Sequence, residues 1–116
     1  MDEAFMRVYV SMVAQFVLLL ASLYVTQPAL NLAFLRIPLE LTANAIAVYT
    51  FFMTRSIDVN AIRRMGEADL GLTSVLSLVN AAMPGASELA NTIATLAVIT
   101  LAFSVGFLYA LGKVFT

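Results

Sequence analysis

Two long runs without a charged side chain constrain this chain more than any other feature. Residues 8–35 hold 28 consecutive uncharged positions, and residues 89–112 hold 24. A helix of about 20 apolar residues is long enough to cross the hydrocarbon core of a bilayer. In a chain of 116 residues, two such runs predict a single membrane-embedded domain that covers residues 1–116.

The composition supports the same environment. Hydrophobic residues make up 62% of the chain and charged residues 11%, whereas a soluble domain is about half apolar and about a quarter charged. A soluble protein of this size has too little interior to hide so much apolar surface. We therefore expect a membrane-inserted chain whose partners are membrane lipid, copies of itself or other membrane subunits.

The residue types that carry most protein chemistry are missing. Cysteine and histidine are both absent, which removes thiolate and imidazole ligands and the commonest general base. The sequence also lacks glycine-rich phosphate loops and nucleophile-elbow motifs. These absences predict a non-enzymatic protein with no catalytic, cofactor-binding or metal-binding residues, for which lipid is the one bound molecule expected.

The hydrophobic pattern predicts an all-α protein whose helices are interrupted at prolines. Proline lacks a backbone donor and clashes with the preceding turn, so Pro28, Pro38 and Pro84 are expected to end, start or kink helices. The predicted helices cover about 2–26, 39–55 and 87–114, with a charged turn over 55–69 and a short helix over about 71–83.

Two topologies fit this pattern. In the first, three spans over about 5–26, 39–55 and 87–114 form a three-helix bundle. In the second, two long arms kinked at the prolines form a helical hairpin that turns at the charged segment 55–69. Arginine is concentrated at 55–64, and the positive-inside tendency would place that segment in the cytoplasm.

Alanines recur at helical spacing in two of the predicted helices. Residues three or four apart share one helix face, and small residues on a shared face let helices approach closely in lipid. The pattern predicts a packing seam, although alanine is also common in helices generally. The residues of the predicted seam are Ala43, Ala47, Ala86, Ala90, Ala94 and Ala97.

A few polar residues lie within the apolar segments and need partners there, because an unpaired polar group in lipid costs several kcal/mol. We expect Asn44 and Asn91 to contact each other between neighbouring helices. Glu40 and Glu88 are candidates for proton relay or cation binding. Both follow prolines at helix starts, where capping and the helix dipole are the simpler explanation.

The only basic cluster consists of Arg55, Arg63 and Arg64. Guanidinium groups bind phosphate well, so these residues are candidates for contact with lipid head groups or with nucleic acid. The alternative is an ordinary membrane-flanking turn, in which the acids between 58 and 69 pair with the arginines.

The segment from Tyr49 to Arg55, leading into Ser56–Arg64, resembles the helix-to-basic-turn junction of hydrophobic pilins. These are the subunits of conjugation-type filaments, including archaeal DNA-transfer pili. The resemblance covers about 39–114, is architectural, and treats 87–114 as the second arm; the apolar arm 4–37 is additional. It implies a cell-surface filament in which lipid co-assembles with protein. The basic turn would line the lumen of that filament, through which nucleic acid passes transiently.

These observations predict a structural subunit of a lipid-containing assembly, most specifically a conjugation-like pilin for DNA transfer. The first alternative is an accessory transmembrane subunit of a respiratory, photosynthetic or transport complex. The second is a hydrophobic coat protein of an archaeal virus.

Overall fold

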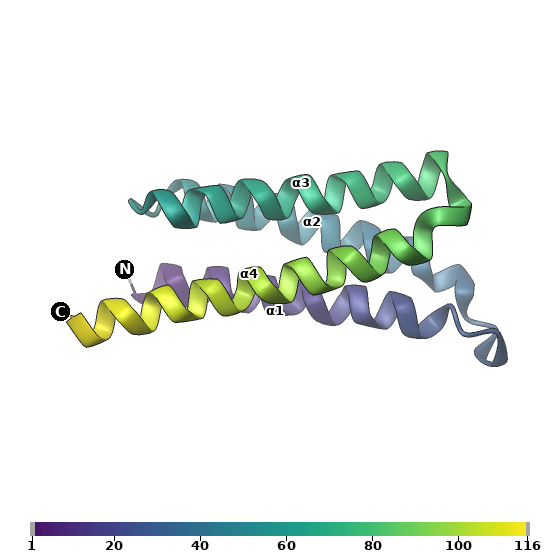
Figure 1. Cartoon of the computed structure of the whole chain (residues 1–116), viewed down its shortest axis with the longest axis horizontal. Coiled ribbons are helices and arrows are strands. Elements are labelled where there is room, and N and C mark those ends of the chain that lie inside the picture. Colours follow the sequence, from purple (N-terminus) through teal and green to yellow (C-terminus); the bar gives the residue numbers. More distant parts are fainter. Residues whose placement is uncertain (1, 116) are drawn as a thin grey trace.

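Four antiparallel helices make up the part of the chain that the structure, a computed structural model, describes (residues 2–115; Figure 1). Short 3-10 turns at 28–30, 33–35 and 84–86 lie between them, and residues 2–115 contain no strand. The predicted all-α class is therefore confirmed. The helices are α1 (Asp2–Val25), α2 (Arg36–Arg55), α3 (Asn60–Ala82) and α4 (Ser87–Phe115).

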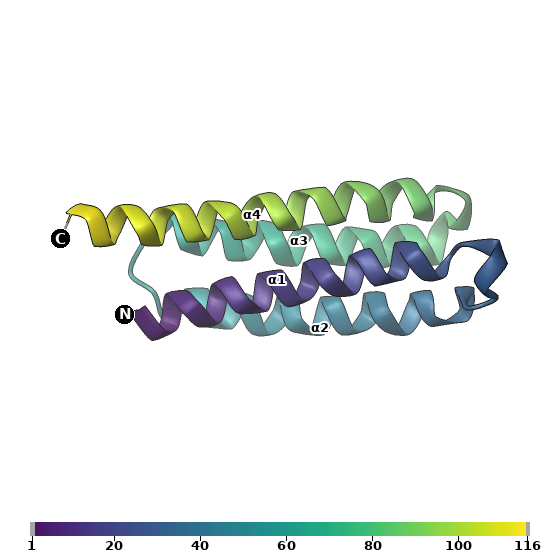
Figure 2. The same ribbon diagram turned by 90° about the horizontal axis from the view of Figure 1, so that it is seen from below.

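The helices occupy the corners of an up-down-up-down bundle. Helix α1 packs against α2 and α4, and α3 packs against the same two helices on the other side. The start of α1, the end of α4 and the loop 56–59 lie at one end of the bundle, here called the loop end (Figure 2). The connector 26–35 and the turn 83–86 lie at the opposite end, here called the connector end.

The structure corrects both predicted topologies and the boundaries near the middle of the chain. The segment 55–69 is not a charged turn, and 71–83 is not a separate short helix, because one helix, α3, covers Asn60–Ala82. Only residues 56–59 form the loop. Gly66 lies inside α3, buried against α2.

The prolines mark turns and a helix start. Pro28 and Pro84 each open a 3-10 turn between helices, and Pro38 is the third residue of α2. The first turn of a helix tolerates proline because its backbone amides have no intrahelical partner. Proline kinks within the helices are not observed in the described chain.

The residues that line the core recur three or four positions apart along every helix. This spacing is the heptad seam of helices that pack side by side in a bundle. In α1 the seam comprises Phe5, Val8, Met12, Gln15, Leu19 and Ser22; in α2, Glu40, Ala43, Ala47, Thr50 and Thr54; in α3, Ile62, Gly66, Asp69, Thr73 and Leu76; in α4, Asn91, Ala94, Val98, Ala102 and Val105.

The outer surface of the bundle is largely apolar. Among the described residues, three helical segments are long and apolar enough to cross a membrane: Glu3–Val25, Arg36–Arg55 and Glu88–Leu111. Large apolar side chains point outward from all four helices, including Val17, Phe52, Leu78 and Phe103. Length and composition thus make this a protein with transmembrane-type helices.

Helices α2 and α3 come unusually close at Gly66. A β-carbon at this position would lie 2.9 Å from both Cβ and Cγ2 of Thr54 and would also overlap its hydroxyl. Thr54 is fully buried, and its hydroxyl donates to the Phe51 carbonyl at 2.8 Å. The absence of a side chain at Gly66 therefore sets the spacing of the two helices near the loop end.

Candidate functional site

The interior of the bundle alternates between apolar and polar layers. Beginning at the loop end, an apolar cluster that includes Phe5, Met12 and Val105 is followed by a polar layer around Asp69. A second apolar cluster that includes Leu19 and Leu76 then separates this layer from a polar layer around Glu40. The Asp69 layer is defined as Ser11, Gln15, Thr50 and Asp69, and the Glu40 layer as Ser22, Glu40, Asn80, Asn91 and Thr95.

The Asp69 layer joins α1, α2 and α3. The Gln15 Nε2 donates to Asp69 Oδ2 at 2.7 Å and to Thr50 Oγ1 at 3.1 Å. The hydroxyl oxygens of Ser11 and Thr50 lie 2.7 Å apart. Gln15, Thr50 and Asp69 are completely buried. Hydrogen bonds of this kind hold helices together where the surroundings are apolar.

The Glu40 layer joins all four helices. Asn91 of α4 donates from Nδ2 to Glu40 Oε1 at 2.9 Å, and the same group donates to the Ser22 hydroxyl of α1. Asn80 of α3 donates to the other carboxylate oxygen of Glu40. Arg36, one helical turn before Glu40, adds a favourable charge interaction. The Glu40 carboxylate is therefore well provided with partners.

The structure places the predicted polar residues differently from the sequence analysis. Asn91 does make an interhelical polar contact, but with Glu40 and Ser22, not with Asn44. The Asn44 Oδ1 is buried without a hydrogen-bond partner among the described residues. Capping does not explain Glu40, which is only 3% exposed inside the bundle. Glu88, by contrast, is exposed in the first turn of α4, where a carboxylate complements the helix dipole.

The predicted alanine seam is present in part. Ala43 and Ala94 are buried in the second apolar cluster, Ala90 packs against it, and Ala47 is fully buried. Two further alanines are only partly buried: Ala97 in α4 and Ala86 in the turn before it. The predicted seam therefore packs most closely at Ala43, Ala47 and Ala94, and less closely at Ala86 and Ala97.

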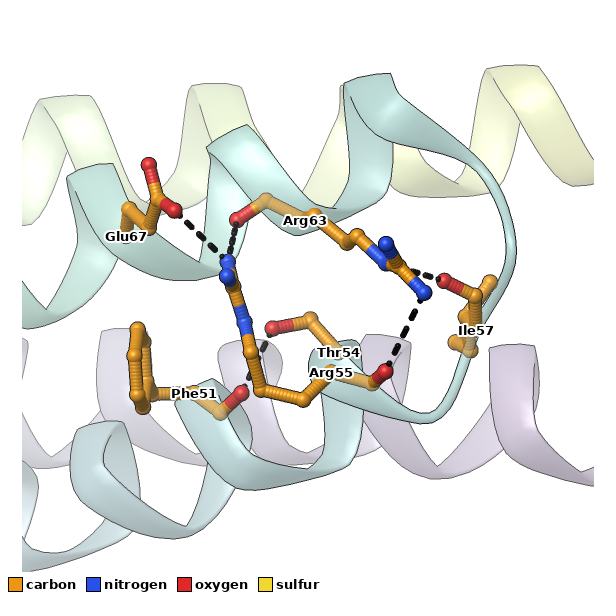
Figure 3. Close-up of polar contacts among 6 residues, drawn as sticks. All are labelled: Phe51, Thr54, Arg55, Ile57, Arg63 and Glu67. Carbon is orange, nitrogen blue, oxygen red and sulfur yellow. Dashed lines mark hydrogen bonds and ion pairs between the residues drawn. The ribbon is translucent and has the colours of Figure 1, made fainter.

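Two of the three arginines of the predicted basic cluster bind backbone carbonyls across the loop between α2 and α3 (Figure 3). Arg55 lies over the Phe51 ring, pairs with Glu67 at 2.8 Å and donates to the Arg63 carbonyl at 2.9 Å. Arg63 donates in return to the carbonyls of Ile57 at 2.9 Å and of Arg55 at 3.4 Å. These contacts favour the membrane-flanking turn over a cluster that faces a lumen.

Arg64, the third arginine, is exposed on α3. We expect Arg63→Ala to destabilise the folded chain by about 1 kcal/mol, because the carbonyls of Arg55, at the end of α2, and of Ile57, in the loop, lose their charged donor. Arg64→Ala is the matched control and should leave stability unchanged. Unfolding of both variants in detergent, followed by circular dichroism, measures the difference. Equal stability of the two variants would contradict a structural role for Arg63.

Comparison with protein-family models, with curated proteins and with solved structures found no match to this chain. Its chemistry must therefore be inferred from its own residues. Among the described residues, no group of three or more His, Cys, Asp or Glu side chains could hold a metal ion. The polar layers are accordingly built from single carboxylates with amide and hydroxyl groups.

Sequence reasoning missed the Asp69 layer completely. Asp69 was placed at the end of the charged turn 55–69, and Gln15 was given no role. The signal that could have located them is the heptad spacing itself: Gln15 and Ser22 lie seven residues apart, as do Asp69 and Leu76. Residues seven apart lie on the same helix face, so Gln15 shares the face of the buried Ser22, and Asp69 shares the face of the buried Leu76.

Proposed function

We propose that this chain is a membrane-embedded structural subunit, non-enzymatic, whose apolar exterior packs against lipid and other subunits. The observation that carries the proposal is the distribution of polarity. Phe52 and Phe103 are each 66% exposed on the outside, whereas Gln15 and Asp69 are 0% exposed inside. A soluble bundle has the opposite arrangement, with charged and polar residues on the face away from the core.

The lengths of the helices agree with insertion into a membrane. The shortest helix, α2, has 20 residues and is about 30 Å long at 1.5 Å per residue, close to the thickness of the hydrocarbon core. Helix α3 is less apolar because Asp69, Thr73 and Asn80 face the interior of the bundle. Its exposed charges, Arg64 and Glu67, lie near the loop end. We therefore place all four helices across the bilayer.

Alkaline carbonate extraction of membranes from cells that express the chain tests insertion. An integral four-helix protein should stay in the membrane pellet and be released only by detergent. Release by carbonate alone, or recovery of a soluble monodisperse protein without detergent, would refute the proposal.

The proposal includes an orientation with the loop end in the cytoplasm. Arginine flanking the helices is concentrated there, in agreement with the positive-inside tendency. The arginines at the loop end are Arg7, Arg55, Arg63 and Arg64, and the connector end has Arg36.

Single cysteines can test this orientation because the natural chain has none. We expect Ala29→Cys, at the connector end, to react with a membrane-impermeant maleimide in intact cells. Asp58→Cys, in the loop, should react only after the membrane is permeabilised. Both positions are exposed, so a difference between them reports sidedness. Labelling in the reverse order would overturn the orientation.

The identity of the assembly is a further part of the proposal. Within the closed bundle the Glu40 carboxylate accepts hydrogen bonds from Asn80 of α3 and Asn91 of α4, which supports a subunit that folds first and assembles later through its outer surface. An accessory subunit of a larger membrane complex fits this order best. The conjugation-like pilin and the viral coat protein stay predictions from the sequence.

Extraction with a lipid-retaining polymer, followed by mass spectrometry of the co-purifying proteins, distinguishes the accessory subunit, the pilin and the coat protein. Larger membrane subunits at fixed stoichiometry would support the accessory subunit. Filaments in sheared cell-surface material that contain this chain would support the pilin, and recovery in virions would support the coat protein. Recovery of the chain alone, as a lone monomer, would contradict all three.

A further inference from the structure

The carboxylate of Asp69 is buried without a compensating charge. Asp69 is 0% exposed, and its one hydrogen-bond donor among the described side chains is the neutral amide of Gln15. The ion pairs identified in the described chain join exposed side chains near the loop end, none of which is Asp69. An isolated buried carboxylate is very costly. Glu40, by comparison, has two amide donors and Arg36 nearby.

The Asp69 layer also has more acceptors than donors. Asp69 Oδ1 and Gln15 Oε1 are buried oxygens without a hydrogen-bond partner in the described structure. The Ser11 and Thr50 hydroxyls donate to neither oxygen, because they lie within hydrogen-bond distance of the Val8 and Ile46 carbonyls, at 2.8 Å each, and of one another, at 2.7 Å. Two unpartnered oxygens beside an uncompensated negative charge call for a positively charged ligand.

We propose that the Asp69 layer binds a single monovalent metal cation such as Na⁺. The ligands would be Asp69 Oδ1 and Gln15 Oε1, with the hydroxyl oxygens of Ser11 and Thr50 as neutral neighbours. Oxygen-only sites select hard cations. One carboxylate neutralises one positive charge, so a monovalent ion leaves the layer neutral, whereas a divalent ion would leave a buried positive charge.

The surroundings of the site strengthen this assignment. The Asp69 layer lies between the apolar cluster of Met12 and Ile62 and that of Leu19 and Leu76. Electrostatic attraction between a carboxylate and a cation is stronger in such a low-dielectric interior than in water. Ionisable residues within membrane segments commonly mark ion sites. The site goes beyond the proposed structural role and does not depend on the identity of any partner.

Thermal unfolding of the full-length chain in detergent tests the site. Circular dichroism is recorded at equal concentrations of NaCl or choline chloride, which keeps the ionic strength constant. A ligand that binds only the folded state raises its stability as the ligand concentration increases. We expect Na⁺ to raise the Tm by several degrees relative to choline, in a saturable manner.

Two matched substitutions locate the effect. Asp69→Asn keeps the shape of the side chain but removes its charge, so the variant should fold in choline and lose the Na⁺ response. Asp58→Asn makes the same change at a fully exposed loop position and should keep the response. Retention of radioactive Na⁺ by the purified protein should follow the same pattern, with at least a tenfold loss of affinity in Asp69→Asn.

Three results would overturn the cation site. The first is an equal Tm of the natural chain in the two salts. The second is a Tm that responds to pH but not to Na⁺, which would show that Asp69 binds a proton in place of a metal cation. The third is a full Na⁺ response in Asp69→Asn, which would place the ion elsewhere. None of these results bears on membrane insertion, which carbonate extraction measures separately.

Discussion

Replacing Asn91 with leucine is expected to destabilise the bundle by about 2–3 kcal/mol. Asn91 is 1% exposed, and its amide donates to both Glu40 Oε1 and the Ser22 hydroxyl. Leucine has the same branched shape and the same number of side-chain heavy atoms but no donor, so the Glu40 carboxylate loses one of its two amide partners while it stays buried. Removing the partner of a buried charged group costs more than the hydrogen bond itself contributes.

The exposed neighbour Thr92 gives the control for this substitution. Thr92→Leu also replaces a polar side chain of α4 with leucine, but on the outer surface, and should leave stability nearly unchanged. Unfolding of the variants in mixed detergent micelles measures both. If Asn91→Leu were as stable as Thr92→Leu, the hydrogen bonds of Asn91 to Glu40 and Ser22 would contribute nothing to the stability of the fold.

A double-mutant cycle with Glu40→Gln isolates the cause. Glutamine at position 40 carries no charge, so Asn91→Leu should cost less in that background than in the natural chain. Residues that share a hydrogen bond are expected to couple in this way. Equal costs in both backgrounds would show that Asn91 acts through packing alone, independently of the buried carboxylate.

The bounds of the apolar helices could be predicted from the sequence, but the polar contacts inside the bundle could not. Uncharged runs and prolines predicted the ends of α1 and α4 within two residues of the observed Asp2–Val25 and Ser87–Phe115. The first half of α3, before the predicted short helix 71–83, was missed because its charged residues face two environments. Arg64 and Glu67 are exposed, whereas Asp69, two residues beyond Glu67, is fully buried.

The polar layers depend on contacts between residues far apart in the sequence. Gln15 and Asp69 are separated by 54 positions, and Ser22 and Asn91 by 69. Composition alone cannot pair such residues, because the pairing is decided by which helices become neighbours. The heptad spacing of each helix would have shown which polar residues face inward, while the choice of partner required the structure.

Introducing alanine at position 66 is expected to destabilise the bundle by about 2 kcal/mol. The new methyl group would lie 2.9 Å from Cβ and Cγ2 of Thr54, well inside van der Waals contact. Thr54 has little freedom to move, because it is buried and branched at Cβ. Helices α2 and α3 must therefore separate, and overpacking of this kind typically costs about 1–3 kcal/mol.

The second glycine of α3 makes this prediction specific. A β-carbon at Gly71 would have no atom within 4 Å outside its own stretch of helix backbone and its chain neighbours, and alanine there should stabilise the helix by about 0.5–1 kcal/mol through its higher helix propensity. The two substitutions are chemically identical and lie five residues apart, yet they should change the unfolding free energy in opposite directions. Helix propensity alone would raise stability in both variants. A decrease confined to Gly66→Ala would thus show that the contact with Thr54 outweighs propensity, and an increase in both would disprove the close approach of α2 and α3.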